Sequence, residues 1–323
     1  MMRILSGVQP SGKLHIGNYF GMMKPCIELQ NSGEAFIFIA DYHALTSLPK
    51  PNELRQRVLD VAIDLLACGL DPEKATLFRQ TDIPEVTELT WILSCFTPKG
   101  LMERCHSYKD KVAKGLEANL GLFTYPVLMA SDILIYRSNI VPVGKDQKQH
   151  LEVTRDIATR FNNAYGDILV MPEPQIKEEV SVVPGIDGEK MSKSYDNTIP
   201  LFVSEKKLLK LVRKIKTNSL EPGEPKDPDS CTLFQIHSAF ASAEESQAMR
   251  QRYAEGIGWG EAKDSLFEYL NAHLREPRER YLALMEDPGY IEDVLKKGAE
   301  RARAEAAPLM DRLRQSVGLG RFA

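Results

Sequence analysis

Two stretches of this sequence combine residue types that bind phosphate groups. In the first, a Gly/Pro turn at residues 10–12 leads into His15-Ile16-Gly17-Asn18, directly after a β-prone run at residues 3–8. His15 and Asn18 are three residues apart, so both can donate hydrogen bonds from one face of a helical turn. The N-terminus of such a helix attracts anions through its free N–H groups and its dipole. An ordinary polar helix start has the same pattern, so this stretch alone indicates a phosphate site only weakly.

The second stretch is Lys190-Met191-Ser192-Lys193-Ser194. Gly185 and Gly188 precede it and predict a mobile loop. Two lysines three residues apart on this loop supply charges that can close on a polyphosphate. A solvated basic loop is the simpler alternative, but it does not account for the methionine or the two serines.

Polar residues also follow two apolar runs that are typical of strands buried in a parallel sheet. Residues 34–40 end at Asp41-Tyr42-His43, and residues 140–143 end at Gly144-Lys145-Asp146. In open α/β sheets, ligands bind beyond the carboxyl ends of the strands, and an acidic residue at such a junction suits a ribose diol. For Asp41 and His43, a capping interaction within the loop is an equally good alternative.

Asp132 is the unusual residue of a predicted helix at residues 123–136, which has Pro126 in its first turn. Apolar side chains surround it, so Asp132 either lies at the wet edge of the helix or is buried with a hydrogen-bond donor. Tyr125, Met129 and Asp132 share one helix face. A carboxylate on such an apolar wall can recognise an N–H or O–H group at the far end of an apolar ligand.

A parallel sheet is needed to bring these residues together. Four β-prone runs alternate with helical patterns, which predicts βαβ units and an α/β fold with a Rossmann-like, doubly wound parallel sheet. The predicted strands are residues 3–8, 34–40, 75–80 and 140–143, and the predicted helices between and after them are residues 52–69, 85–108, 123–136 and one that follows Gln147.

After Pro200 the strand pattern stops and only helices are predicted. We therefore predict a Rossmann-like catalytic domain over residues 1–194 and a smaller all-helical domain over residues 195–323, whose last helix is a candidate to pack back on the catalytic domain. The predicted helices of the second domain include residues 234–240, 244–253, 259–274, 277–286 and 290–317.

Composition excludes several classes of protein. The chain has 323 residues, 43% of them hydrophobic and 27% charged, with a net charge of −4, so nothing attracts nucleic acid to the molecule as a whole. The five cysteines show no Cys-x-x-Cys pairing, which indicates reduced thiols and gives no reason to assign a metal. No apolar run is long enough for a membrane span. We expect a soluble, cytoplasmic protein.

Three surfaces have two interpretations each. Lys109, Lys111 and Lys114 form a small basic cluster that is either solvated or reaches the distal end of a triphosphate. Lysines within residues 206–216 make one helix face basic, for solvation or for contact with a nucleic-acid backbone. Residues 85–108 carry surplus apolar side chains, which indicates core packing or, less often, a dimer face.

The two phosphate-binding stretches, together with the alternating strands and helices, resemble the signature of the class I aminoacyl-tRNA synthetases. The lysine stretch matches at all five positions, and the resemblance extends over essentially the whole chain, closest to the tryptophan-specific branch. The tyrosine-specific branch is the nearest rival. Its members carry a Tyr on the first strand, whereas this chain has Leu5, which suits an indole better than a phenol. Asn18 stands where the wider family has His, as is usual for the tryptophan branch.

The resemblance implies a mechanism and its site residues. Tryptophan's carboxylate would attack the α-phosphorus of ATP to give tryptophanyl-adenylate and pyrophosphate, and tRNA(Trp) would then accept the amino acid, with catalysis by positioning and charge stabilisation. The implied catalytic residues are His15, Asn18, Lys111, Lys190 and Lys193. The implied ATP-binding residues are Gln9, Ser11, Gly17, Asn18, Gly144, Asp146, Gln147, Val183, Lys190, Met191, Ser192, Lys193 and Ser194. The implied tryptophan-binding residues are Leu5, Gly7, His43, Tyr125, Met129, Asp132, Ile133, Val141, Val143 and Gln147.

The resemblance also bears on cofactors and partners. Mg²⁺ would arrive with ATP, and the active protein would be a homodimer without a membrane partner. Some relatives hold an iron–sulfur cluster through four cysteines. Here Cys231 matches the first position, but Trp259 and Ala262 stand at two later ones, so we expect no cluster.

Two other functions stay open from the sequence. One is a small-molecule adenylyltransferase or ligase that does not use tRNA, although the long helical extension weighs against it. The other is a synthetase-like protein that binds tRNA or tryptophan without catalysis, although the complete motifs weigh against that.

Overall fold

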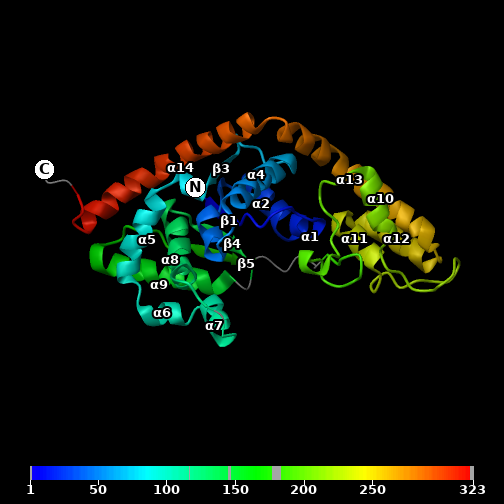
Figure 1. Cartoon of the computed structure of the whole chain (residues 1–323), viewed down its shortest axis with the longest axis horizontal. Helices are drawn as coiled ribbons and strands as arrows, with labels where there is room; N and C mark the ends of the chain where they lie inside the picture. The colour runs from blue at the N-terminus through cyan, green and yellow to red at the C-terminus, as the bar shows by residue number, and fades with distance from the viewer. Residues whose placement is uncertain (1, 116, 145–146, 177–182, 321–323) are drawn as a thin grey trace.

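Five parallel strands form one twisted sheet in the order β3-β2-β1-β4-β5 (Figure 1). The computed structural model describes residues 2–115, 117–144, 147–176 and 183–320. The four predicted strands are confirmed. The sequence did not predict β5, because Glu-Pro-Gln-Ile contains no apolar run. This strand lies at the edge of the sheet, where proline is tolerated. The strands are β1 (Arg3–Val8), β2 (Glu34–Ile39), β3 (Ala75–Arg79), β4 (Ile140–Val143) and β5 (Glu173–Ile176).

The strand order reverses between β1 and β4, and the pairing there is short. β1 is paired with β2 along its whole length, from Arg3 opposite Glu34 to Val8 opposite Ile39. By contrast, β1 is paired with β4 at one position, Ile4 opposite Ile140. The sheet therefore opens toward the carboxyl ends of these two strands, at the place where ligands bind in doubly wound folds.

Helices cover both faces of the sheet, as a doubly wound fold requires. Ile4 and Val8 of β1 pack with the helices on one face, α1 (Ile16–Asn18), α2 (Lys24–Glu28) and α4 (Pro51–Ala67). Leu5 of β1 faces the opposite core, with α5 (Glu85–Phe96), α8 (Leu120–Ile135), α9 (Lys148–Tyr165) and α14 (Pro288–Ser316). The alternation of side chains along one strand thus builds two separate cores.

Some predicted helix boundaries are wrong. The segment 85–108 is broken into α5, α6 (Lys99–Glu103) and the start of α7 (His106–Ala113), because Pro98 keeps Thr97 extended. Helix α8 begins at Leu120, where Asn119 caps it, so Pro126 lies in its second turn and not its first. The two helices predicted around Pro277 are one continuous helix, α13 (Trp259–Met285).

The C-terminal helices form a second group beside the sheet and then return to it. α10 (Glu205–Arg213) and α11 (Thr232–Phe240) pack on α13, and α11 also contacts α12 (Ala243–Ala254). α13 contacts α4, and α14 runs along the edge strand β3, as an arch over the top of the molecule in Figure 1. Two ion pairs hold α14 to α5, Arg303–Glu85 at 2.7 Å and Arg314–Glu88 at 2.6 Å. The division into domains at residue 194 stays a prediction.

Within the described ranges, no helix has the length and apolar character that crossing a membrane requires.

The contact between α14 and β3 depends on Gly298. A Cβ at this position would lie 1.8 Å from the backbone oxygen of Leu77, so the helix and the strand approach more closely than any other residue allows. We predict that Gly298→Ala lowers the free energy of unfolding by about 2 kcal/mol or more, as overpacking against backbone does. Chemical denaturation measures this.

Gly260→Ala is the matched control, because Gly260 is also helical and a Cβ there would meet nothing within 4 Å. It should leave stability unchanged or slightly raised. Equal effects of the two substitutions would contradict the role given to Gly298.

Candidate active site

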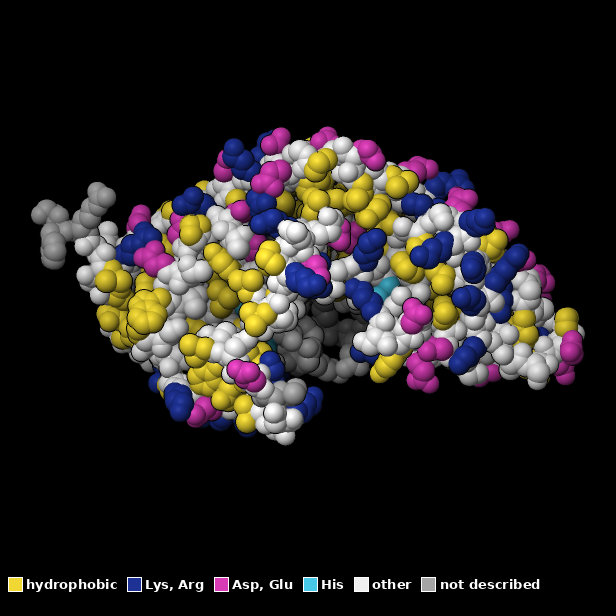
Figure 2. Space-filling model, in the orientation of Figure 1, with side chains coloured by type: hydrophobic (Ala, Val, Ile, Leu, Met, Phe, Trp, Pro, Cys, Tyr) yellow, Lys and Arg dark blue, Asp and Glu magenta, His cyan; other side chains and the backbone are white. Residues whose placement is uncertain are grey.

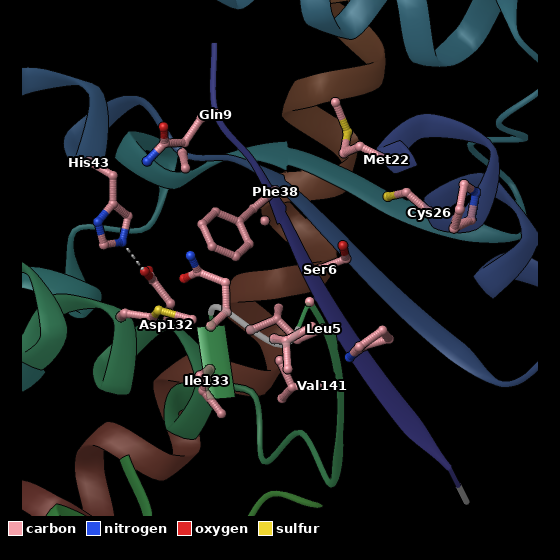
Figure 3. A pocket seen from close by; sticks show the side chains of 18 of the residues that line it. Leu5, Ser6, Gln9, Met22, Cys26, Phe38, His43, Asp132, Ile133 and Val141 are labelled. Carbon is pink, nitrogen blue, oxygen red and sulfur yellow. Dashed lines mark hydrogen bonds and ion pairs between the residues drawn. The ribbon is translucent and has the colours of Figure 1, made fainter. Parts of the chain in front are cut away.

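A cavity of about 420 Å³ lies at the opening between β1 and β4 (Figure 3). All ten residues of the predicted tryptophan set line it, together with Gln9 and Gly144 of the predicted ATP set. Strand β1 contributes Leu5 and Gly7, and a Cβ on Gly7 would lie 2.6 Å from Cζ of Phe38, so glycine is required there. The lining residues that the sequence did not suggest are Ser6, Gly21, Met22, Pro25, Cys26, Phe38, Ala40 and Pro142.

The cavity extends along both sides of β1. Leu5, Ile133 and Val141 lie together near Asp132, whereas Met22 and Cys26 lie across the strand (Figure 3). This volume falls within the range of about 300 to 1,000 Å³ that small-molecule sites occupy. Its walls are mostly apolar, with a few polar groups at the ends.

Asp132 is the only carboxylate among the described residues that line the cavity. Its side chain is buried, with 1% of the residue exposed, and burial raises its pKa from the usual value, although His43 and Gln80 oppose that shift. His43 Nε2 lies 2.8 Å from Oδ2 (Figure 3). Gln80 Nε2 donates to Oδ1 at 2.8 Å and to Oδ2 at 2.9 Å. These donors compensate the buried charge, so Asp132 is placed as an acceptor at the end of an apolar cavity.

Asp41 and His43 have different surroundings, although the sequence allows the same two interpretations for both. Asp41 accepts hydrogen bonds from the backbone N–H and the hydroxyl of Thr81 and from the N–H of Tyr42, so it stabilises the loop. His43 contacts Asp132 and lines the cavity. The sequence did not single out Gln80, although it follows a buried strand just as Asp41 follows β2.

His15 and Asn18 cap the first helix reciprocally. The N–H of Asn18 donates to Nδ1 of His15 at 3.3 Å, and the N–H of His15 donates to Oδ1 of Asn18 at 3.2 Å. Burial, together with the positive charge of Lys193, lowers the pKa of His15 to about 4. The ring is therefore neutral near pH 7, and since Nδ1 accepts, Nε2 carries the proton. The Nδ2 amino group of Asn18 is the second donor.

The lysine loop lies on the turn that precedes this helix. Lys193 Nζ donates to the carbonyl oxygen of Ser11 at 3.1 Å, and burial lowers the pKa of Lys193. A Cβ on Gly17 would lie 3.5 Å from Cβ of Met191, so the two predicted phosphate stretches are adjacent. The side chain of Asn197 supports the loop by accepting from the N–H of Ser192 and donating to the carbonyl of Lys190.

Among the remaining predicted site residues, Val183, Ser192 and Ser194 make hydrogen bonds with the backbone of the lysine loop, and Lys111 lies in α7. Val183 accepts a hydrogen bond from the N–H of Met191. The Oγ of Ser192 accepts one from the N–H of Ser194. Lys111 lies in the last turn of α7, and its role in binding phosphate stays a prediction. Asp146 lies outside the described residues.

A doubly wound sheet that carries both motifs at its switch point defines a class I aminoacyl-tRNA synthetase. The family described as tRNA synthetases class I (W and Y) matches residues 1–275, and the chain belongs to this family. The family inferred from the two motifs and the fold class predicted from the alternating strands and helices are thereby confirmed.

The chain is also similar over nearly its whole length to individual tryptophan–tRNA ligases. The tryptophan–tRNA ligase of Rhodopirellula baltica is 51% identical over 319 residues, covering 98% of this chain and 100% of the relative. That of Fusobacterium nucleatum is 50% identical over 321 residues, covering 99% and 98%. The crystal structure of tryptophanyl-tRNA synthetase from Campylobacter jejuni complexed with ADP and tryptophan has a TM-score of 0.91 at 49% identity, covering 98% of this chain and 100% of that one.

Burial and the charge of Lys193 predict an unusual titration of His15, and its cap contact with Asn18 predicts its tautomer. The proton should bind with a midpoint at about pH 4, with Nε2–H as the neutral tautomer. Between this value and the usual 6.5, unfolding takes up a proton, so the contribution of His15 to stability falls as the pH is lowered through that window. NMR of the chain labelled with ¹⁵N-histidine measures the midpoint and the tautomer, and His15→Gln assigns the signal. A midpoint near 6.5 with Nδ1–H would contradict the capping arrangement.

Proposed function

We propose that this chain is a tryptophan–tRNA ligase, which activates L-tryptophan with ATP and transfers it to tRNA(Trp). The reaction would take place in the cytoplasm and supply tryptophanyl-tRNA for translation. The observation that carries the proposal is Asp132, a buried carboxylate held as an acceptor at the end of an apolar cavity. An indole is apolar except for one N–H donor, so it matches this cavity in shape and in hydrogen bonding. The full-length similarity to tryptophan–tRNA ligases supports the same assignment.

The reaction needs positioning and charge stabilisation, not a protein nucleophile. With the indole N–H on Asp132, the amino acid's carboxylate points toward the turn at residues 10–18 and attacks the α-phosphorus of ATP. Charge develops on the phosphate oxygens as pyrophosphate leaves. We assign its stabilisation to Nε2–H of His15, the amide of Asn18, and the ammonium groups of Lys190 and Lys193.

Magnesium fits this scheme as a companion of ATP. Within the described ranges there is no group of three or more His, Cys, Asp or Glu side chains that could hold a metal ion. Mg²⁺ keeps several waters and commonly binds through substrate phosphates. We therefore propose that the phosphates of ATP, together with water, supply most of its ligands. Cys231 is buried with its Sγ 3.6 Å from the hydroxyl of Tyr253, and the absence of an iron–sulfur cluster stays a prediction.

We propose that tRNA contacts the lysines of α10 and Lys214, which caps its C-terminal end. These side chains line a surface groove of about 360 Å³ with Ser204 and Leu211, and Figure 2 shows Lys and Arg side chains gathered over this part of the molecule. The four lysines, Lys206, Lys207, Lys210 and Lys214, are all exposed. Their charges contrast with the net charge of −4 of the whole chain, so they form a local site for phosphate groups.

We also propose that the enzyme is a homodimer. Large apolar side chains are exposed around α5 and α8, with Trp91 exposed by 72%, Leu120 by 74% and Leu48 by 79%. A second copy of the chain would bury them, since large exposed apolar patches mark association sites in soluble proteins.

The proposed reaction is tested by amino-acid-dependent exchange of pyrophosphate into ATP. We predict exchange with tryptophan and at least about 10⁴-fold less, as kcat/KM, with tyrosine, since polar groups left unpaired reject the wrong ring. Lys193→Ala should lower kcat for exchange by about 100-fold, the effect of removing one preorganised charge. Exchange driven by tyrosine, or full activity of Lys193→Ala, would overturn the assignment.

The groove on α10 predicts a defect in one half-reaction. Lys206→Glu with Lys210→Glu should lower kcat/KM for charging tRNA by about tenfold at 0.1 M salt and flatten its salt dependence, because fewer counterions are released. Pyrophosphate exchange should not change. Lys296→Glu with Lys297→Glu, on the exposed face of α14, is the matched control and should leave charging intact. Equal losses in both double variants would contradict a specific tRNA contact.

A further inference from the structure

Gln80 is a buried amide next to the cavity that has partners at both ends. It is the first residue of a 3-10 turn after β3 and is 1% exposed. Its Oε1 accepts hydrogen bonds from the backbone N–H of Tyr42 at 3.0 Å and of His43 at 3.4 Å. A backbone N–H can only donate, so Oε1 must face these groups and the Nε2 end must face Asp132. The orientation of the amide is therefore fixed by the main chain after β2.

The fixed amide determines how Asp132 is used. Its Nε2 group lies within 2.8 Å of Oδ1 and 2.9 Å of Oδ2, so it bridges both carboxylate oxygens. Oδ2 also contacts His43 Nε2 at 2.8 Å. A carboxylate oxygen accepts about two hydrogen bonds, so Oδ2 is saturated and Oδ1 keeps one acceptor position.

We propose that Gln80 is a positioning residue for recognition of the indole N–H: it holds Asp132 so that Oδ1 alone receives the ligand's donor. This inference rests on the proposed function. Among the described residues, Asp132 belongs to the cavity lining and Gln80 does not, so Gln80 acts through the carboxylate. It also joins three elements, since the turn after β3 carries the amide, the short helix α3 (Asp41–Ala44) after β2 orients it and α8 carries Asp132.

The alternative is that Gln80 only maintains the packing around α8. The two roles differ in what they do to a ligand that lacks the N–H group. A packing defect weakens tryptophan and such a ligand alike, whereas a misplaced Asp132 weakens only the ligand that donates to it.

The test compares tryptophan with 3-(3-benzothienyl)alanine, in which sulfur replaces the indole N–H. In pyrophosphate exchange, Gln80→Met, which keeps the chain length and removes both ends of the amide, should raise KM for tryptophan by about 10- to 100-fold. The KM for the sulfur analogue should change by less than about twofold, and the KM for ATP should not change. The preference of the wild type for tryptophan over the analogue should therefore be lost.

Gln30→Met is the matched control. Gln30 also uses both ends of its amide, with the carbonyl of Gly69 at 3.2 Å and the N–H of Asp71 at 2.8 Å, but it does not line the cavity. Its substitution should leave both KM values unchanged. Should Gln80→Met fail to fold, as judged by thermal melting, Gln80→Asn carries the same comparison, because it keeps an amide in the site but is one methylene too short to reach both the N–H groups after β2 and Asp132.

Every outcome of this comparison either supports or contradicts the positioning role of Gln80. Equal losses with both ligands, or no loss with either, would overturn the positioning role of Gln80. Failure of the wild-type chain to support exchange with tryptophan would overturn the proposed function itself, and it is seen before any variant is made.

Discussion

The short pairing between β1 and β4 is the constraint on which the site depends. The two strands meet at Ile4 and Ile140, and the cavity occupies the opening beyond that point. Had the two strands paired along their whole length, backbone hydrogen bonds would fill this space. The reversal of strand order at the same place sends the helices that follow β1 and β4 to opposite faces, so residues from both cores reach one cavity. Gly7 keeps the opening usable because Phe38 lies where a larger residue would go.

The polar groups at this opening are held in place by contacts within the chain. His15 is kept neutral by burial and by the charge of Lys193 and takes its tautomer from the N–H of Asn18, Lys193 donates to the carbonyl of Ser11, and Asp132 is bridged by Gln80. Each of these contacts uses a backbone or amide group to fix the direction in which a side chain donates or accepts. Preorganised dipoles of this kind stabilise developing charge without reorganisation during the reaction. In the proposed reaction, groups for catalysis and for substrate choice would therefore meet along β1 and the turn after it, although several of them come from other elements.

The hydrophobic periodicity of the sequence predicts most of the strands and helices, but it does not predict the details of the site. The runs that became β1 to β4 are apolar and regular, so they were predicted, whereas the polar edge strand β5 has no such pattern. Breaks at Pro98 and the early start of α8 depend on local caps that periodicity does not register. The ten residues of the tryptophan set came from a resemblance to a family, and the structure brings them to one cavity. Gln80 was missed because a glutamine after a strand has no distinctive signal until its two neighbours, Tyr42 and Asp132, are placed.

In the proposed complex with tryptophan, Asp132 receives the indole N–H inside the opening between β1 and β4. NMR of the protein saturated with tryptophan labelled with ¹⁵N at the indole nitrogen tests this most directly. We predict that the bound N–H proton shifts downfield and is protected from exchange with water, and that both effects disappear in Asp132→Asn while Gln30→Met retains them. A bound N–H signal at the position of free tryptophan, or one that Asp132→Asn leaves unchanged, would contradict it.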